Sequence, residues 1–216
     1  MRIVDLSWPV APGMPMFPGD PPVTATRMGS LEADGFLSHQ WTLPAHSGTH
    51  VDAPAHVLAN GAPLAALPLG RFAGAGVVLD VRARPGLAVT EADVLPHLPR
   101  AKGAAFVLLH TGDSQRWGEP AYYTAGAYLT PGAARLLAVV PGVSGIGLDA
   151  GSVDPLEAAD LPAHHIVLGA GCVIVENLRG LEALPQSGFT FVCLPVLGAD
   201  GSPVRAAAFW EQECRA

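Results

Sequence analysis

The chain has 216 residues, of which half are hydrophobic and 14% are charged, and its formal net charge at pH 7 is −7. This length suits one domain with a full hydrophobic core, and we expect residues 1–216 to form that single domain. The twelve Lys and Arg residues are scattered along the chain. Proteins that bind nucleic acids need a basic patch, so we expect no nucleic-acid partner.

Two apolar stretches bear on the location of the protein. Asp5 interrupts the apolar N-terminal residues too early for a secretory signal. The longest apolar run, Ile166–Val175, has ten residues. A transmembrane helix needs about twenty, so we interpret this run as a buried strand and expect no membrane contact. Cys172 and Cys193 lie within apolar runs, as reduced core thiols do, and we predict a cytoplasmic protein.

Short runs rich in Val, Ile, Leu or aromatic residues recur along the chain, and most are bounded by Gly, Pro or Asp, which is typical of β-strands. The predicted strands are Arg2–Ser7, Val23–Arg27, Leu37–Leu43, Gly76–Val81, Ala105–His110, Val143–Leu148, Cys172–Glu176, Thr190–Pro195 and Ala206–Trp210. Helix signals are fewer. Thr90 and Thr130 can cap helices over residues 91–98 and 131–140, and a short helix can span Asp154–Ala159. Many strands and few helices predict an α+β fold with a mixed or antiparallel sheet.

One segment concentrates residue types that bind metal ions. The sequence HSGTHVDAPAH, which begins at His46, holds three of the eight histidines and an aspartate. Neutral imidazole nitrogens and carboxylate oxygens suit a divalent cation. Gly48 and Pro54 disfavour a continuous helix here. We therefore expect a loop or a strand end to bring His46, His50 and Asp52 to one point, with Gly48 permitting a tight turn.

We predict a different role for His56, which follows the chain-redirecting Pro54. A histidine close to a metal but outside its ligand shell can transfer a proton at neutral pH. A purely structural metal site has closed coordination and no need for such a histidine. His56 therefore favours an enzyme over a metal-binding protein without catalysis. A serine hydrolase would require a G-x-S-x-G elbow, which the sequence does not contain.

A second group of polar residues flanks the apolar run in the C-terminal half. His164 and His165 precede the run, and Glu176 ends it. A carboxylate at the end of a buried strand is unfavourable unless it is paired or bound to a metal. From the residues alone, a salt bridge between Glu176 and Arg179 is the simpler interpretation, and metal binding is the alternative.

The segment HSGTHVDAPAH resembles the signature of the cyclase family of metal-dependent hydrolases, which includes bacterial kynurenine formamidases. DLSWPVAPGMPMFPGDPPV, GLDAGSVDP and HHIVLGAGCVIVENLRGL also resemble blocks of this family, in the same order. The resemblance implies the swivelling β/β/α fold, a homodimer or homotetramer, and a small-molecule substrate. The implied reaction is hydrolysis of the formamide of N-formyl-L-kynurenine. The alternative is a different family substrate, such as isatin or a related cyclic amide.

The resemblance also implies roles for individual residues. The implied metal ligands are His46, His50, Asp52, His164 and Glu176, and Asp52 can bridge two ions. His56 matches the catalytic acid/base of the family, and His165 is the expected bystander. Two Zn²⁺ ions per subunit are implied, with Mn²⁺ as the alternative, because a mixed shell of histidine and carboxylate suits both.

Two positions depart from the formamidase pattern. Phe17 precedes the Pro-Gly-Asp turn, where formamidases typically have a tryptophan that contacts the substrate. Its ring can stack on an aromatic substrate, but it has no indole N–H. His110 stands before Thr-Gly, where many relatives have arginine. Both departures leave the implied metal ligands unchanged and concern the identity of the substrate.

Overall fold

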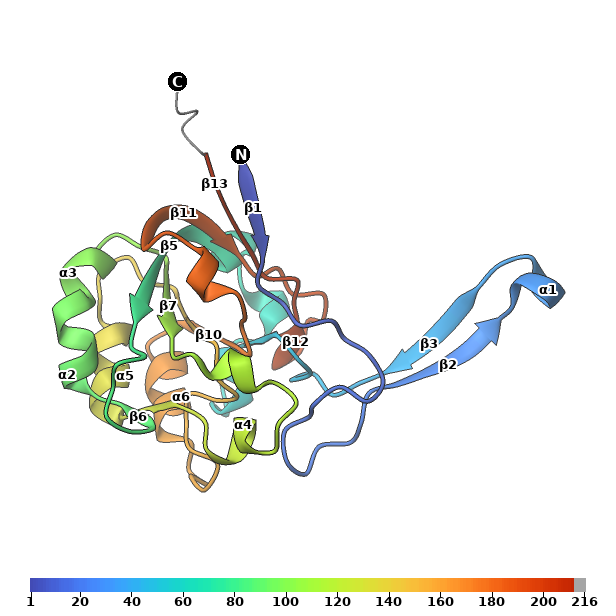
Figure 1. Cartoon of the computed structure of the whole chain (residues 1–216), viewed down its shortest axis with the longest axis horizontal. Coiled ribbons are helices and arrows are strands. Elements are labelled where there is room, and N and C mark those ends of the chain that lie inside the picture. Colours follow the sequence, from blue (N-terminus) through green and yellow to red (C-terminus); the bar gives the residue numbers. More distant parts are fainter. Residues whose placement is uncertain (212–216) are drawn as a thin grey trace.

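The computed structural model describes residues 1–211 and is organised around a curled sheet of nine strands (Figure 1). The strand order is β1-β13-β11-β5-β7-β9-β10-β4-β12. The four neighbouring strands β5, β7, β9 and β10 run parallel, and the flanking strands pair antiparallel. Their bounds are β1 Arg2–Asp5, β4 His50–Asp52, β5 Ala73–Asp80, β7 Phe106–His110, β9 Gly145–Leu148, β10 Val173–Glu176, β11 Ser187–Val192, β12 Gly201–Pro203 and β13 Ala207–Trp210. The predicted mixed sheet is confirmed.

Side chains of the central strands alternate between two hydrophobic cores, as the period of a β-strand requires. In β7, Val107 and Leu109 enter the core on the helical side, whereas Phe106 and Leu108 enter the core on the opposite side. All four are fully buried. Burying an apolar side chain of this size contributes about 1.5–3 kcal/mol, so both cores hold the sheet in place.

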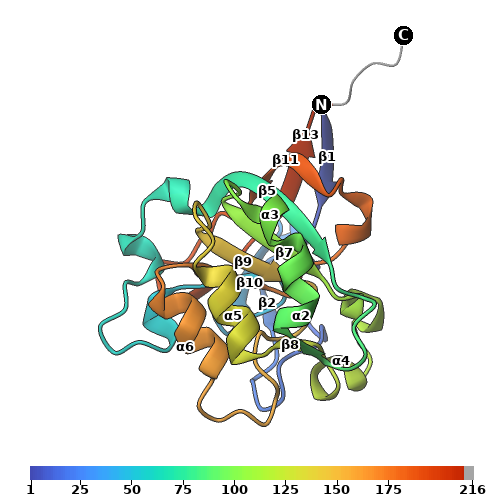
Figure 2. The ribbon, with the colours of Figure 1, turned by 90° about the vertical axis from the view of Figure 1, so that its left-hand side faces the viewer.

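Four helices cover one face of the sheet (Figure 2). They are α2 Glu91–Val94, α3 Leu98–Ala101, α5 Pro131–Ala138 and α6 Pro162–Gly169. Two of them begin where the sequence predicts. The hydroxyl of Thr130 accepts a hydrogen bond from the N–H of Ala133 at the start of α5, and Thr90 forms a capping box with Asp93 at the start of α2.

Smaller elements connect the strands and helices. They are the strand pair β6 Ala88–Val89 and β8 Tyr128–Leu129, the helix α4 Ala121–Thr124, and the 3-10 turns η1 Pro54–His56, η2 Leu64–Ala66, η3 Leu69–Phe72, η4 Leu95–His97, η5 Asp113–Arg116 and η6 Leu181–Ala183. Within residues 1–211, no helix has the length and apolar character needed to cross a bilayer.

A hairpin arm extends away from the sheet (Figure 1). It consists of β2 (Thr24–Gly29), the short helix α1 (Leu31–Asp34) at the tip, and β3 (Ser38–Thr42). The two strands pair with each other in a separate two-stranded sheet. Both arm strands were predicted from the sequence, whereas α1 was not.

Two predicted elements are wrong. Ile166–Val175 is not one strand: its first part belongs to α6, a turn follows at Gly171, where φ is +78°, and β10 begins at Val173. Asp154–Ala159 forms turns instead of a helix. Asp154 does not begin a helix of its own, because its carboxylate caps α6 by accepting the N–H groups of Ala163 and His164.

Candidate active site

The short strand β4 places two polar side chains on one surface of the sheet. His50 and Asp52 are two residues apart and therefore point to the same side, while Val51 between them is fully buried in the core. On the neighbouring strand β10, Glu176 lies directly opposite His50. The register of two strands distant in sequence thus brings an imidazole and two carboxylates together, with both carboxylates nearly inaccessible to water.

His46 approaches this group from the turn before β4. Gly48 has φ +61°, a left-handed conformation that favours glycine, and it lets the chain reverse between His46 and His50. The Nδ1 atom of His46 lies 2.7 Å from Oδ1 of Asp52, and its Nε2 lies 3.0 Å from Oδ2 of Asp200. The predicted convergence of His46, His50 and Asp52 through a loop and a strand end is therefore observed.

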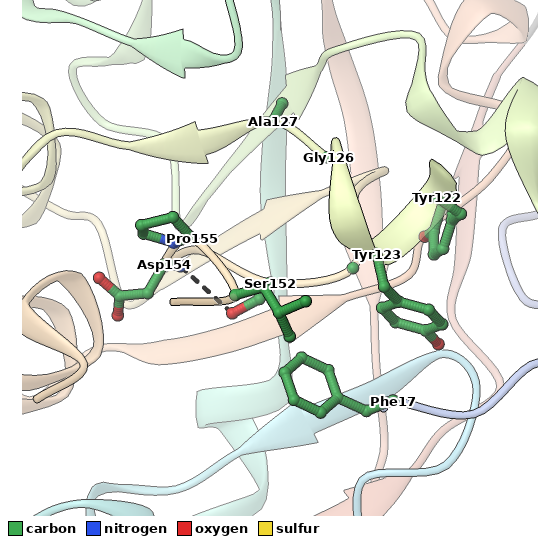
Figure 3. A pocket seen from close by; sticks show the side chains of 10 residues that line it. Phe17, Tyr122, Tyr123, Gly126, Ala127, Ser152, Asp154 and Pro155 are labelled. Atoms are coloured by element: carbon green, nitrogen blue, oxygen red, sulfur yellow. Dashed lines mark hydrogen bonds between the residues drawn. The ribbon is translucent and has the colours of Figure 1, made fainter. Parts of the chain in front are cut away.

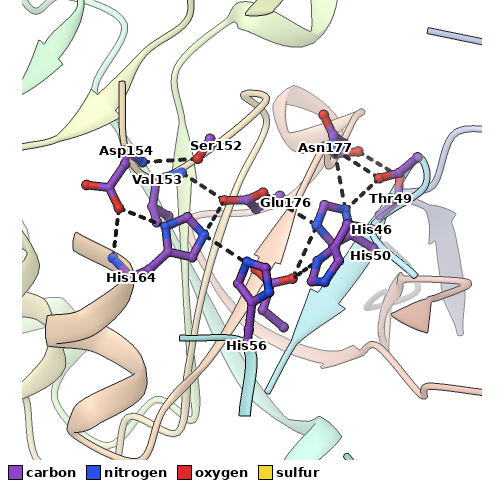
Figure 4. A network of polar contacts seen from close by, with 12 residues as sticks. His46, Thr49, His50, His56, Ser152, Val153, Asp154, His164, Glu176 and Asn177 are labelled. Carbon is purple, nitrogen blue, oxygen red and sulfur yellow. Dashed lines mark hydrogen bonds and ion pairs between the residues drawn. The ribbon is translucent and has the colours of Figure 1, made fainter. Parts of the chain in front are cut away.

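His164 reaches the same point from α6 (Figure 4). Its Nδ1 lies 2.7 Å from Oδ2 of Asp154, which leaves Nε2 directed at the other carboxylates. That Nε2 lies 3.4 Å from Oε1 of Glu176 and 3.8 Å from Oδ2 of Asp52. Glu176 is held in turn by the backbone N–H of Val153, which donates to Oε1 at 2.8 Å.

The donor atoms form two triads that share one carboxylate. His46, His50 and Asp52 make one triad, and Asp52, His164 and Glu176 make the other. Oδ2 of Asp52 is buried and has no hydrogen-bond partner in the described structure. An unpartnered buried carboxylate oxygen is costly, and a cation would satisfy it. The donor atoms of the triads therefore fit a divalent cation, and a mixed set of imidazole nitrogens and carboxylate oxygens suits zinc or manganese.

The tautomer of His50 supports its role as a ligand. Its Nδ1 lies 2.9 Å from the carbonyl oxygen of Gly48 and donates to it, so Nε2 is the nitrogen left to bind a cation. That Nε2 lies 3.2 Å from Oδ1 of Asp52. Backbone or carboxylate partners on the far nitrogen commonly orient metal-binding histidines in this way.

His56 lies beside the triads in η1, with its ring centroid 4.1 Å from that of His46. Its Nδ1 lies 3.5 Å from Oδ2 of Asp200. His46, His56 and Asp200 form a third possible donor group. Asp200, however, is 45% exposed, and its Oδ2 already contacts both rings. This group therefore needs no cation, and Asp200 instead orients the two histidines.

The pKa values of the histidines at the site differ: those of His46 and His164 are raised, and that of His56 is lowered. Burial acts to lower the pKa of His46 and His164, but nearby carboxylates outweigh it. Hydrogen bonds to Asp52 and Asp154 respectively are the leading opposing cause, and the pKa rises to about 9 for His46 and about 10 for His164. For His56, burial together with repulsion from His46 and His164 outweighs the carboxylates and lowers the pKa below 6.5. His56 is therefore neutral at pH 7 and able to accept a proton.

The triads open into a pocket of about 260 Å³. Phe17 and Tyr123 form an aromatic wall, with their rings edge to face at 5.6 Å between centroids. Leu161 and Asp20 also line the pocket. A smaller cavity between Phe17, Tyr123 and Asp154 adjoins it (Figure 3). A flat apolar group could lie against this wall and place a polar bond at the triads.

The structure thus brings together every residue that the sequence singled out for the site. His46, His50, Asp52, His164 and Glu176 form the two triads, with His56 beside them and Phe17 across the pocket. His165 is exposed on the outer side of α6, consistent with a bystander. The interpretation of Glu176 that the residues alone favoured, a salt bridge to Arg179, is wrong: Arg179 donates to Asp5 and lies over the ring of Trp8.

Three further residues of the site were not identified from the sequence. Asp154 orients His164, Asp200 contacts His46 and His56, and Tyr123 completes the aromatic wall. Asp200 stands 154 positions from His46 and gives no local signal. It reaches the site because β12 pairs with β4, with Gly201 opposite Asp52.

A family model described as "Putative cyclase" matches residues 4–155, which is more than half of the chain. The chain belongs to the cyclase family. This cyclase-family chain is 35% identical to the kynurenine formamidase of Salinibacter ruber (strain DSM 13855 / M31), covering 95% of the chain and 96% of that protein. The predicted family is confirmed, and with it the assignment to the hydrolases.

Solved structures agree with this assignment. Isatin hydrolase A from Labrenzia aggregata, bound to benzyl benzoate, is 26% identical, with a TM-score of 0.86 over 98% of this chain and 94% of that one. A predicted metal-dependent hydrolase from Bacillus stearothermophilus is 27% identical, with a TM-score of 0.76 over 96% and 97%. The mixed sheet with few helices is thus the fold of the cyclase family.

Proposed function

We propose that this cyclase-family chain is a metal-dependent amidohydrolase that converts N-formyl-L-kynurenine and water to L-kynurenine and formate. The observation that carries the proposal is the shared, buried Asp52 between two ligand triads, beneath a pocket with one neutral histidine and an aromatic wall. The 35% identical kynurenine formamidase supports this choice of substrate.

In this proposal His46, His50 and Asp52 hold one divalent cation, and Asp52, His164 and Glu176 hold the second. Zn²⁺ is the proposed ion, with Mn²⁺ as the alternative for the same donor set. A divalent cation at this point supplies Lewis acidity, which lowers the pKa of water and polarises a carbonyl oxygen. Each triad contributes three ligands, so positions stay open for water and substrate.

His56 transfers the proton in the proposed reaction. As water adds to the formyl carbon, the neutral ring accepts the water proton. As the C–N bond breaks, the same ring returns this proton to the aniline nitrogen of the leaving group. Asp200, 3.5 Å from Nδ1 of His56, orients the ring and stabilises it while it carries the proton.

The aromatic wall binds the aryl ring of the substrate. Phe17 and Tyr123 stand on one side of the pocket, and the triads lie at its base. Stacking or edge contacts with one aryl ring contribute about 0.5–1.5 kcal/mol beyond the area buried, which is enough to orient the formamide. The proposal also places the enzyme in the cytoplasm, consistent with the buried free thiols of Cys172 and Cys193.

A second candidate substrate is isatin or a related cyclic amide. The similarity to isatin hydrolase A over nearly the whole chain favours it. Phe17 is compatible with both substrates, because isatin is also flat and aromatic. The same catalytic residues would act, with the aniline nitrogen staying attached to the product after ring opening.

The test combines metal analysis with a small substrate panel. We expect purified protein to contain divalent metal at a defined stoichiometry, and a chelator to abolish hydrolysis until the metal is restored. N-formyl-L-kynurenine, isatin and a simple aryl formamide are compared by kcat/KM. Highest kcat/KM for isatin would replace the proposed substrate by the second candidate. Full activity in metal-free protein would refute the proposal as a whole.

A further inference from the structure

A buried asparagine follows Glu176 at the end of β10 in an uncommon backbone conformation. Asn177 is 2% exposed, and its φ of +56° lies in the left-handed region, which few residues other than glycine and asparagine adopt readily. Its backbone N–H donates to the carbonyl oxygen of Ala150 at 3.0 Å, and its own carbonyl oxygen accepts the hydroxyl of Thr49 at 2.6 Å. These two bonds hold the backbone in place and leave the side-chain amide free for contacts of its own.

The side chain of Asn177 lies beside His50 (Figure 4). Its Nδ2 donates to the carbonyl oxygen of Gly48 at 2.9 Å, and Nδ1 of His50 donates to the same oxygen at 2.9 Å. The two nitrogens are 3.5 Å apart, as expected for two donors that share one acceptor. A carbonyl oxygen has two lone pairs, so these bonds satisfy it completely. The position of the Gly48 carbonyl, and with it the direction of the His50 ring, therefore depends on Asn177.

A tyrosine determines which end of this amide faces Gly48. The hydroxyl of Tyr122, a fully buried residue, donates to Oδ1 of Asn177 at 2.8 Å. Burial, with the nearby Tyr123 and carboxylates, raises the pKa of Tyr122 well above its usual range, so the hydroxyl keeps its proton. Because the Gly48 carbonyl can only accept, Nδ2 must face it and Oδ1 must face Tyr122. The amide thus has one arrangement that satisfies both neighbours.

Packed aromatic rings join the side chain of Asn177 to its backbone. The ring of Tyr122 meets that of Trp117 edge to face at 5.1 Å between centroids, and Trp117 stacks on Trp8 at 4.9 Å. The backbone N–H of Trp8 donates to the Thr49 hydroxyl at 2.9 Å, and Thr49 donates in turn to the carbonyl oxygen of Asn177. These contacts form a closed ring, so the amide cannot move without disturbing the residues packed around it.

We propose that Asn177 is a positioning residue, which holds the His50 imidazole in the orientation that binds a cation by fixing the Gly48 carbonyl. Tyr122 acts one step further out, by fixing the amide of Asn177. Partners of this kind on the far nitrogen of a histidine orient the ring and raise its affinity for a metal. The inference rests on the metal site of the proposed function, but it concerns the His50 ring and holds for any substrate.

Asn177→Gly separates the amide from the backbone. Glycine adopts φ +56° without strain, so this variant keeps the turn after Glu176 and loses only the side chain. We expect unchanged circular dichroism and a loss of Zn²⁺ affinity of about 10–100-fold, measured by competition with a chromophoric chelator. Asn60→Gly is the matched control, because Asn60 is the other asparagine of the chain and is exposed in a turn. It should bind Zn²⁺ with the wild-type affinity.

Tyr122→Phe tests the same assignment while keeping the buried ring. Without the hydroxyl the amide of Asn177 can rotate, so we expect Zn²⁺ affinity to fall, but by less than in Asn177→Gly. Because Tyr122 acts through the amide, the double variant should bind Zn²⁺ no more weakly than Asn177→Gly alone. Losses that add in the double variant would overturn the proposed order of action. If Asn177→Gly does not fold, Tyr122→Phe compared with the wild type provides the test.

A second measurement reports on the His50 ring directly, in metal-free protein. A ring N–H that donates to a buried carbonyl is protected from exchange with water and gives an observable proton NMR resonance. We expect this Nδ1–H resonance of His50 in the wild type and in Asn60→Gly, and its loss in Asn177→Gly. Its persistence in Asn177→Gly, or equal Zn²⁺ affinity in the two glycine variants, would overturn the inference and leave the proposed function standing. A wild-type protein that binds no Zn²⁺ would refute the proposed function, and the His50 resonance would then decide the inference by itself.

Discussion

The carboxylate of Asp154 lies 2.7 Å from Nδ1 of His164 and turns the opposite nitrogen of the ring toward Asp52 and Glu176. Burial opposes the charge on Asp154, but hydrogen bonds from His164 and the start of α6 prevail and lower the pKa of this carboxyl. It therefore stays ionised at neutral pH. This pair keeps a proton on Nδ1 and orients Nε2 as the atom that would bind a cation, as outer carboxylates do in metal sites.

Asp154→Asn should weaken metal binding at the triad that contains His164. An amide can present its N–H₂ to Nδ1 and favour the wrong tautomer, so we expect affinity for one Zn²⁺ per chain to fall about 10–100-fold. The same change weakens the cap of α6 and lowers the free energy of unfolding by about 1 kcal/mol. Isothermal titration with Zn²⁺ measures the first effect and urea unfolding the second. Asp160→Asn, at an exposed position nearby, is the control. Equal affinity for Zn²⁺ in the two variants would contradict the role of Asp154 in orienting His164.

His56→Asn should reduce the rate of hydrolysis without loss of metal. Proton transfer by a positioned side chain contributes about 10²–10⁴-fold, and we expect kcat to fall within that range. Metal stoichiometry should stay at the wild-type value because His56 belongs to neither triad that shares Asp52. His165→Asn removes an exposed histidine from the same region and should keep full activity. Loss of metal from His56→Asn would instead make His56 a ligand.

The sequence was most informative where residues of the site are close together in the chain. His46, His50 and Asp52 fall in one segment, so residue type and spacing were enough to predict that they converge. Asp154 was misinterpreted as the start of its own helix. Its side chain caps α6 nine residues later, and a capping signal in the sequence does not state which helix it serves.

Residues joined by strand pairing could not be found from local patterns. β4 and β12 have three residues each, too few to show a period of alternation. Their pairing nevertheless brings Asp200 to His46 from the far end of the chain. The apolar run Ile166–Val175 shows a related limit, because a continuous apolar stretch has the same appearance in a buried helix and a buried strand.

Gly201→Ala should disturb the site through packing alone. A Cβ atom at Gly201, which lies opposite Asp52 in the β4–β12 pair, would collide with the ring of His46. Because β12 is held in the sheet, we expect the ring to move and Zn²⁺ affinity to fall at least 10-fold, with the fold retained. Gly70→Ala is the matched control, since its Cβ would meet open space. Zn²⁺ titration and circular dichroism compare the two variants. Equal Zn²⁺ affinities would show that the His46 ring moves aside without effect on metal binding.

Asp5→Asn should lower stability in a pH-dependent way. Asp5 accepts hydrogen bonds from Arg205 at 2.7 and 2.9 Å and from Arg179 at 3.3 Å, joining β1 to two distant segments. Partial burial acts to raise the pKa of Asp5, but the bonds from Arg205 and from the N–H of Ser7 prevail and lower it. A lowered folded-state pKa means that the stabilisation is present above the unfolded value of about 3.9 and is lost as pH falls through the folded value.

We therefore expect the difference in free energy of unfolding between wild type and Asp5→Asn to be at most about 1 kcal/mol at pH 7, because the carboxylate is partly exposed. The difference should be the same at pH 5 and should shrink below about pH 3.9 as Asp5 takes up a proton. Urea unfolding at these pH values provides the measurement. Arg205→Gln should reproduce the loss at pH 7, because it removes the same ion pair. A difference that does not change with pH would attribute the loss to packing instead of to the charge on Asp5.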